Sequence, residues 1–170
     1  SETGNYFSDE TATLTLQDLS HILKKFTNAY ELFADGEDMK VEVETSSVSE
    51  VEYDIPLSSL KVMIHHLISH CQQAYEPKEL KFEISEGRQS QTMKEVHFII
   101  SAAAKGKLED LNVARFNKVM ESKLNFETGG PHTNLVKAVL SSLPGSIKAT
   151  LIGNKIRLDI AFWVEPGKAA

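Results

Sequence analysis

The sequence lacks the residue patterns that mark several classes of protein. It has one cysteine, Cys71, which cannot form an internal disulfide, and this favours a reducing compartment, with the cytoplasm as the expected location. Its longest run of basic residues is Lys24-Lys25, while the formal net charge is −6. Because phosphate backbones are bound by clustered lysine and arginine side chains, we expect no nucleic-acid partner.

Long apolar runs are missing as well. No stretch approaches the roughly 18 apolar residues by which a membrane-spanning helix is recognised, and the first residues do not follow the pattern of a signal peptide. We therefore expect no membrane partner. The chain starts with Ser1 and not with methionine, so we expect it to be a processed or excised piece.

What the sequence does contain is typical of one globular domain. Of its 170 residues, 41% are hydrophobic and 25% are charged, which is enough to bury a sizeable core. Residues 1–13 are expected to form a leader, 14–166 the domain, and 167–170 a short tail. The sequence has no internal repeat and no low-complexity segment.

Four segments have the spacing of amphipathic helices, in which apolar residues return every three or four positions. They cover residues 16–33, 57–75, 113–126 and 131–143. Thr15 and Asp18 at the start of the first segment resemble a capping box, and Pro77 ends the second. The apolar face of that second helix is predicted to be deeply buried, and it includes Cys71 and Ala74.

Five segments are predicted to be strands. Polar and apolar residues alternate over 40–45, 80–84, 146–152 and 155–164, and a continuous apolar run lies within 96–106. Gly153-Asn154, between the last two segments, is a strong signal for a tight hairpin turn. Residues 87–94 are interpreted as a polar connection. Trp163 falls on the polar side of the last strand, which indicates either a contact surface or cover by a second layer of helices.

The order of these elements is helix, strand, helix, strand, strand, helix, helix, strand and strand. This order predicts an α+β fold of the two-layer α/β sandwich type, in which a mixed sheet of about five strands carries the helices on one face. Strands and helices do not alternate strictly, so a doubly wound sheet is not expected.

The segment that says most about function is 96–106. Phe98, Ile99 and Ile100 form an apolar run typical of a strand that is covered on both faces. In an α/β domain, a ligand binds at the loop after the carboxyl end of a central strand. Here no carboxylate, hydroxyl or amide side chain lies between Ala102 and Gly106. The sequence therefore predicts that a ligand site of this kind has lost its side chains.

Other candidate sites are weaker. His66 and His70 lie four residues apart on one helix, as two metal ligands would, but no Cys, Asp or Glu lies at a suitable spacing. We therefore expect a polar helix face and no metal. Cys71 is expected in the core, because adjacent helix positions such as His70 do not face it. Gly129-Gly130 before a helix could hold an anion, but no phosphate-loop lysine or serine follows, which favours a flexible joint.

The order of elements resembles that of the ATP-binding domain of sensor histidine kinases, a Bergerat-type sandwich. In that family a magnesium-binding Asn lies on the helix corresponding to 57–75, and His70 takes its place here. The Asp that reads adenine follows the central strand, where this chain has Ala102. The first Gly of the same box becomes Ala104, and only Gly106 remains. The resemblance implies a retained scaffold without nucleotide chemistry, so no cofactor is expected.

A closer resemblance is to the alphaproteobacterial ChpT-like histidine phosphotransferases, in which a kinase-type ATPase domain no longer binds ATP. The likeness runs from about Leu14 onward. The shared features are Phe98-Ile99-Ile100 running into Ala104-Lys105-Gly106, Gly129-Gly130-Pro131 opening a helix, and the final Ala161-Phe162-Trp163-Val164-Glu165-Pro166.

This resemblance implies a non-catalytic ATPase-like domain in a bacterial two-component phosphorelay. Its partners would be receiver domains of response regulators and a hybrid histidine kinase, with a homodimer formed through a helical hairpin absent from this chain. The phosphoacceptor of such proteins is a histidine usually followed by an acidic residue, and none of the six histidines here fits. Either the hairpin has been removed or this chain does not carry phosphate, and no ATPase or kinase activity is expected from it alone. Two alternatives stay open: a divergent histidine kinase ATP-binding domain, and a plain interaction or dimerisation module.

The helix predicted over 113–126 is basic in an otherwise acidic protein. Receiver domains present an acidic phosphorylation pocket ringed by apolar loops, so a complementary surface would combine basic and apolar side chains. We therefore expect the partner-binding surface to consist of Arg115, Phe116, Lys118, Lys123, Gly129 and Gly130.

Overall fold

The computed structural model describes residues 11–33, 40–46, 48–105, 110–121, 137 and 145–167. The elements with described bounds are β1 (Thr11–Thr15), α1 (Leu16–Phe33), β2 (Lys40–Thr45), β3 (Glu52–Pro56), α2 (Leu57–Tyr75), β4 (Glu79–Ser90), β5 (Met93–Ala103), α3 (Asp110–Glu121), β6 (Gly145–Ile152) and β7 (Lys155–Pro166).

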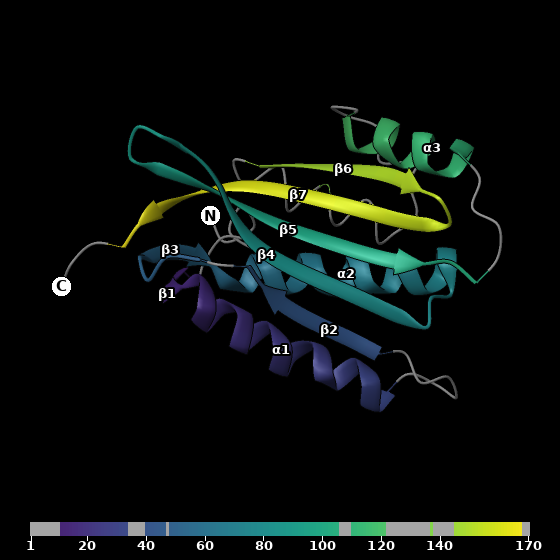
Figure 1. Cartoon of the computed structure of the whole chain (residues 1–170), viewed down its shortest axis with the longest axis horizontal. Coiled ribbons are helices and arrows are strands. Elements are labelled where there is room, and N and C mark those ends of the chain that lie inside the picture. The colour runs from purple at the N-terminus through teal and green to yellow at the C-terminus, as the bar shows by residue number, and fades with distance from the viewer. Residues whose placement is uncertain are drawn as a thin grey trace, which may run out of the picture.

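These strands form one mixed sheet (Figure 1). Its order is β1-β3-β7-β5-β4-β2, and β6 pairs with β7 off this path. The pair β2 and β4 is parallel, whereas β4 with β5, β5 with β7 and β6 with β7 are antiparallel. The long strands β5 and β7 therefore lie at the centre of the sheet.

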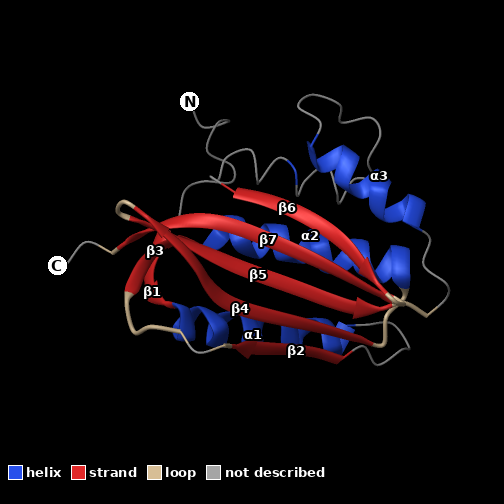
Figure 2. Cartoon of the chain, turned by 45° about the horizontal axis from the view of Figure 1, so that its top comes forward, coloured by secondary structure: helices blue, strands red, loops and turns tan. Residues whose placement is uncertain are grey.

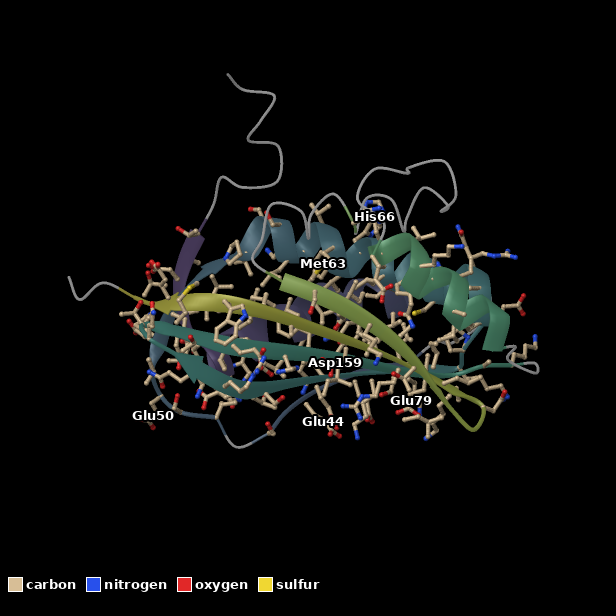
Figure 3. All side chains as sticks on the ribbon, turned by 90° about the horizontal axis from the view of Figure 1, so that it is seen from above. Glu44, Glu50, Met63, His66, Glu79 and Asp159 are labelled. Carbon is tan, nitrogen blue, oxygen red and sulfur yellow. The ribbon has the colours of Figure 1, made fainter. Side chains whose placement is uncertain are left out.

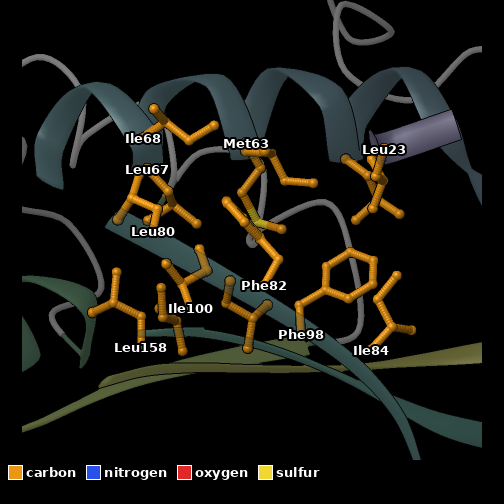
Figure 4. Close-up of a cluster of buried hydrophobic side chains, with 14 of the residues drawn as sticks. Leu23, Met63, Leu67, Ile68, Leu80, Phe82, Ile84, Phe98, Ile100 and Leu158 are labelled. Carbon is orange, nitrogen blue, oxygen red and sulfur yellow. The ribbon is translucent and has the colours of Figure 1, made fainter. Parts of the chain in front are cut away.

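The helices α1 and α2 cover one face of this sheet, and α3 lies beside the edge strand β6 (Figures 1 and 2). Side chains of α2 such as Met63 and Leu67 pack over Phe82, Phe98 and Ile100 of the strands, and all of these are buried (Figure 4). The predicted α+β sandwich, with a mixed sheet and helices on one face, is confirmed.

The five predicted strands are present, and the last of them, β7, has the most regular alternation of buried and outward residues. Its inward residues are all at most 3% exposed: Ile156, Leu158, Ile160, Phe162 and Val164. Gly153 has φ +60° in the turn between β6 and β7, as the hairpin signal predicts.

Two short strands, β1 and β3, were not predicted. They pair with each other over Thr11–Thr15 and Glu52–Pro56, and β3 reaches β7 only through Tyr53 and Asp54. Pro56 ends β3 and directly precedes α2, so a strand lies where the sequence suggested only the start of a helix. Thr11, Ala12 and Thr13, which the sequence places in a leader, belong to the sheet.

The polar connection predicted over 87–94 is wrong, because β4 and β5 continue through it as one hairpin. The turn comes at Gln91, with φ +51°, and the register shifts between Glu86 and Gln89. Neither turn residue is a glycine, so the usual turn signal is missing. Among the described residues no helix covers the outer face of β5, where cover on both faces was predicted, and Ile99 on that face is only half-buried.

The ends of the helices follow their predicted caps. The backbone N–H of Asp18 donates to Oγ1 of Thr15 at 3.0 Å, which confirms the capping residue of α1. α2 ends at Glu76, which is left-handed with φ +46°, just before Pro77. Cys71 is buried as predicted, whereas Ala74 is exposed. None of the helices among the described residues has the length and apolar character needed to cross a membrane.

Candidate functional site

The last turns of α2 meet the end of β5 and the helix α3 at one corner of the molecule. His70 on α2 stacks on Phe116 of α3, with 5.3 Å between ring centroids and 29° between ring planes. The ring of Tyr75 lies edge-on to His70 at 5.7 Å. Phe116 itself is only 5% exposed. The position that resembles the magnesium-binding residue of a kinase is therefore part of an aromatic cluster.

α3 is held at this corner by its apolar face and by one amide side chain. Val113, Phe116 and Val119 recur at helical spacing and are buried. Asn117 donates from Nδ2 to the carbonyl oxygen of Ala149 at 2.8 Å, and the N–H of Ala149 donates to Oδ1 of Asn117 at 2.7 Å. Because Ala149 lies on the edge strand β6, Asn117 pairs with that edge as a neighbouring strand would.

The segment that leaves β5 is tied down on two sides. The N–H of Ala104 donates to the carbonyl of Asn154 at 3.1 Å, and Nδ2 of Asn154 donates to the carbonyl of Ala104 at 3.0 Å. The N–H of Lys105 donates to the carbonyl of Tyr75 at 3.0 Å. Ala102 is buried toward the helices. The described part of this loop therefore contributes backbone contacts that join α2 to the β6–β7 turn.

The thiol at this corner is unsuited to nucleophilic chemistry. Cys71 is fully buried, and burial raises the pKa of its thiol to about 12, so the reactive thiolate does not form near neutral pH. Burial, followed by the neighbouring Cys71, raises the pKa of Tyr75 to about 12. Both groups are neutral members of the core.

The residues predicted to bind a partner are distributed unevenly. Arg115 and Lys118 are exposed on α3, where a partner can reach them. Phe116 is buried and packs against His70, so it anchors α3 to α2 and is not available to a partner. Lys123, Gly129 and Gly130 lie outside the described residues.

The two histidines weighed as metal ligands turn to different partners. His66 lies edge-on to His65, with 4.9 Å between ring centroids, whereas His70 contacts Phe116 and Tyr75. Both are half-buried on α2, and His66 lies on the helix side of the molecule (Figure 3).

A polar cluster, which the sequence did not predict, lies on the outer face of the sheet. His97 on β5 contacts Oε1 of Glu95 through Nε2 at 2.8 Å and Oδ1 of Asp159 through Nδ1 at 2.9 Å. Arg88 on β4 donates to Oε2 of Glu95 at 3.2 Å. The guanidinium of Arg88 also lies 6.0 Å from the ring centroid of Trp163, which is half-buried on this face.

The charges in this cluster shift one another's pKa. Hydrogen bonds from His97 and Arg88 lower the pKa of Glu95 to about 2, against the opposing effect of burial. For His97, burial lowers the pKa, but hydrogen bonds to Asp159 and Glu95 together more than offset it, so the pKa is raised. The charged forms of Glu95 and His97 therefore stabilise each other.

Gly87 leaves the room that this cluster needs. A Cβ atom at this position would lie 2.5 Å from Oε1 of Glu95 and 2.8 Å from the ring of His97. The sequence signal for the cluster is weak: Glu95 and His97 share one side of a strand, but Asp159 and Arg88 reach them only through strand register.

No protein-family model and no curated protein matches the sequence. Solved structures match it over most of its length. Histidine kinase AdeS of Acinetobacter baumannii is 17% identical with a TM-score of 0.60, covering 98% of this chain and 72% of AdeS. The catalytic domain of histidine kinase ThkA is 14% identical with a TM-score of 0.57, covering 91% of this chain and 95% of that domain. The chain has the fold of a histidine kinase ATP-binding domain.

Full-length ShkA in complex with AMPPNP shares this histidine kinase fold. Its TM-score is 0.65 at 10% identity, and the match covers 95% of this chain but only 33% of ShkA. At identities this low the likeness is one of fold, and activity has to be argued from the residues of the site.

Proposed function

We propose that this chain is the non-catalytic, ATPase-like domain of a histidine phosphotransferase in a bacterial two-component phosphorelay. Its role is to help dock the receiver domains between which phosphoryl groups pass. The observation that carries the proposal is the stacking of His70 on Phe116. By resemblance, His70 stands where a kinase has its magnesium-binding Asn, and here an aromatic ring from α3 packs against it.

Two side chains that a nucleotide would need are replaced. The methyl group of Ala102 cannot accept a hydrogen bond from an adenine amine, and such a bond to a charged group contributes roughly 1.5–3 kcal/mol. At His70 a nitrogen ligand replaces the oxygen that magnesium prefers. We therefore expect the affinity for ATP and magnesium to fall outside the useful range.

The docking surface is assigned to α3. Arg115 and Lys118 project from a helix that Phe116 and Asn117 fix to the core and to β6. A helix fixed in this way presents its charges without further ordering when a partner binds, which lowers the entropic cost of association. The surface extends to Lys123, Gly129 and Gly130.

The partners follow from the same proposal. They are receiver domains of response regulators and of a hybrid histidine kinase, whose acidic phosphorylation pocket complements Arg115 and Lys118. A homodimer through a helical hairpin supplied from outside this chain would bring two such surfaces together.

Association kinetics with a panel of receiver domains test this function. The double variant Arg115→Glu/Lys118→Glu should slow association by about tenfold at low salt, because opposite charges steer encounter. The matched control is Lys24→Glu/Lys25→Glu, which makes the same change of charge at exposed positions of α1. It should leave association nearly unchanged.

The result that contradicts the docking surface is an equal effect of both variants, or no effect of either, with circular dichroism showing both to be folded. Equal slowing would mean that only the net charge of the chain matters. No slowing would place the contact away from α3.

The second candidate function is a divergent histidine kinase ATP-binding domain, favoured by the fold it shares with AdeS and ThkA. ATP with magnesium separates the two candidates, because only this second function requires the nucleotide to bind at the corner of α2 and β5.

A further inference from the structure

The face of the sheet opposite α1 and α2 carries a hollow of about 520 Å³. It lies over β5, β7 and β6, and Asp159 within it projects to the side away from α2 (Figure 3). Its charged and ionisable lining groups are Arg88, Glu95, His97, Lys148, Arg157 and Asp159. A volume of this size lies within the range of roughly 300–1,000 Å³ found for small-molecule sites.

Four of these groups neutralise one another. Both ring nitrogens of His97 face carboxylate oxygens, at 2.8 Å and 2.9 Å. A protonated ring donates to both carboxylates, whereas a neutral ring can donate to only one of them, so this geometry favours the imidazolium. With Arg88 on Glu95 at 3.2 Å, two positive groups balance two negative ones. The carboxylates of the hollow are therefore already satisfied.

The remaining two charges are both positive. Lys148 and Arg157 are exposed, and within the described part of the chain neither forms an ion pair. Lys148 lies opposite Asp159 and Arg157 lies opposite Thr150, so the two cations are diagonal neighbours on β6 and β7. Diagonal neighbours of this kind are roughly 7–8 Å apart, with their Cβ atoms somewhat closer. Two cations that face one hollow repel each other, and a dianion between them would remove that repulsion.

An apolar side chain and a hydroxyl complete the same wall. Ile152 lines the hollow and is 56% exposed, one of two large hydrophobic residues exposed among those described. Thr150, between Lys148 and Ile152 on β6, adds a hydroxyl that can donate a hydrogen bond. The hollow thus combines a surplus of two positive charges with an uncovered apolar surface, in a protein of net charge −6.

We propose that this hollow binds a small phosphomonoester, with its dianionic phosphate between Lys148 and Arg157 and its apolar group against Ile152. A phosphate dianion matches the two unpaired cations, whereas a single carboxylate would leave one of them uncompensated. The site lies on the opposite side of the sheet from α2. It is therefore independent of the docking function proposed for α3.

Phenyl phosphate is the probe, titrated onto the ¹⁵N-labelled chain and followed by amide chemical shifts. The expected result is saturable shifts at Thr150, Ile152 and Arg157 in the millimolar range or tighter. Lys148→Ala/Arg157→Ala should weaken binding by at least about tenfold, while the control Lys24→Ala/Lys25→Ala should not. Ile152→Ser should weaken phenyl phosphate and leave inorganic phosphate unchanged.

Three results would overturn the assignment. The first is the absence of saturable shifts in the hollow, and the second is binding that survives Lys148→Ala/Arg157→Ala. The third is benzoate binding as tightly as phenyl phosphate, since the site is assigned to a dianion. Amide spectra of each variant without ligand show whether it is folded, so a loss of binding cannot be mistaken for a loss of structure.

Discussion

The imidazole ring of His70 lies against the phenyl ring of Phe116, with 5.3 Å between ring centroids and 29° between ring planes. His70 lies on α2 and Phe116 lies on α3, so the contact joins two helices that are far apart in the sequence. It fixes α3 at the corner where α2 meets the end of β5.

Phe116→Ala should destabilise the protein by about 3–5 kcal/mol, because it removes a buried aromatic ring and leaves a cavity. Urea unfolding measures the change. Arg115→Ala, the neighbouring exposed position, should change the free energy of unfolding by less than about 0.5 kcal/mol. Equal effects of the two substitutions would mean that Phe116 does not support α3 from inside.

Asn117→Ala should lower the free energy of unfolding by about 1–3 kcal/mol, since the backbone N–H and carbonyl of buried Ala149 lose their partners. Hydrogen exchange at Ala149 should become faster in the variant, because its N–H is no longer bonded. Lys118→Ala is the matched control on the exposed side of α3. Unchanged exchange at Ala149 would show that Asn117 does not hold the β6 edge.

The Glu95–His97 pair should make stability depend on pH in two directions. The pKa of Glu95 is depressed from 4.5 to about 2, so its stabilisation is present above 4.5 and is lost as pH falls toward 2. The pKa of His97 is raised from 6.5, so its stabilisation is complete below 6.5 and is lost as pH rises through the higher folded value.

His97→Gln should therefore cost the most stability between about pH 4.5 and 6.5, and less on either side. Unfolding free energies of the wild type and the variant are measured from about pH 2 to 9, so that the series extends on both sides of this range. His21→Gln, at an exposed position of α1, is the control. The other charged groups that line the same hollow are Arg88, Asp159, Lys148 and Arg157. A difference that stays constant with pH would mean that His97 is not charged in the folded protein.

Gly87→Ala should destabilise the protein by about 1–3 kcal/mol, because the added Cβ would overlap Glu95 and His97. In a Glu95→Ala/His97→Ala background the same substitution should cost much less, since the obstructing atoms are gone. A double-mutant cycle measures this coupling. Additive effects would show that the clash is relieved elsewhere.

The sequence predicts the elements with strong periodicity. β7 alternates buried and outward residues along its length, and α2 repeats apolar residues every three or four positions, so both follow from local pattern alone. β1 and β3 were not predicted, because each is only five residues long and they pair chiefly with each other. Thr-Ala-Thr-Leu-Thr and Glu-Tyr-Asp-Ile-Pro do alternate polar and apolar residues, but over five residues next to a predicted helix this alternation was not assigned to a strand.

The two clusters of side chains depend on information that no local pattern contains. The outer cluster needs the register that brings Asp159 of β7 and Arg88 of β4 to His97 of β5. The contact of His70 with Phe116 needs the packing of α3 on α2. Phe116 in particular was expected at a partner-binding surface. Its helical spacing places it on the apolar face of α3, but spacing alone does not show whether that face packs against the rest of the domain or against a partner.

We expect ATP with magnesium not to bind at the corner of α2, β5 and α3, and a single titration decides whether it does. ATP with magnesium is added to the ¹⁵N-labelled chain, with ShkA, whose structure contains AMPPNP, as a control for the conditions. The expected result is no saturable shift at the amides of Tyr75, Ala102 and Lys105, whatever happens at the outer hollow. Saturable shifts at these three amides with a micromolar dissociation constant would contradict it, and would establish a nucleotide-binding domain instead.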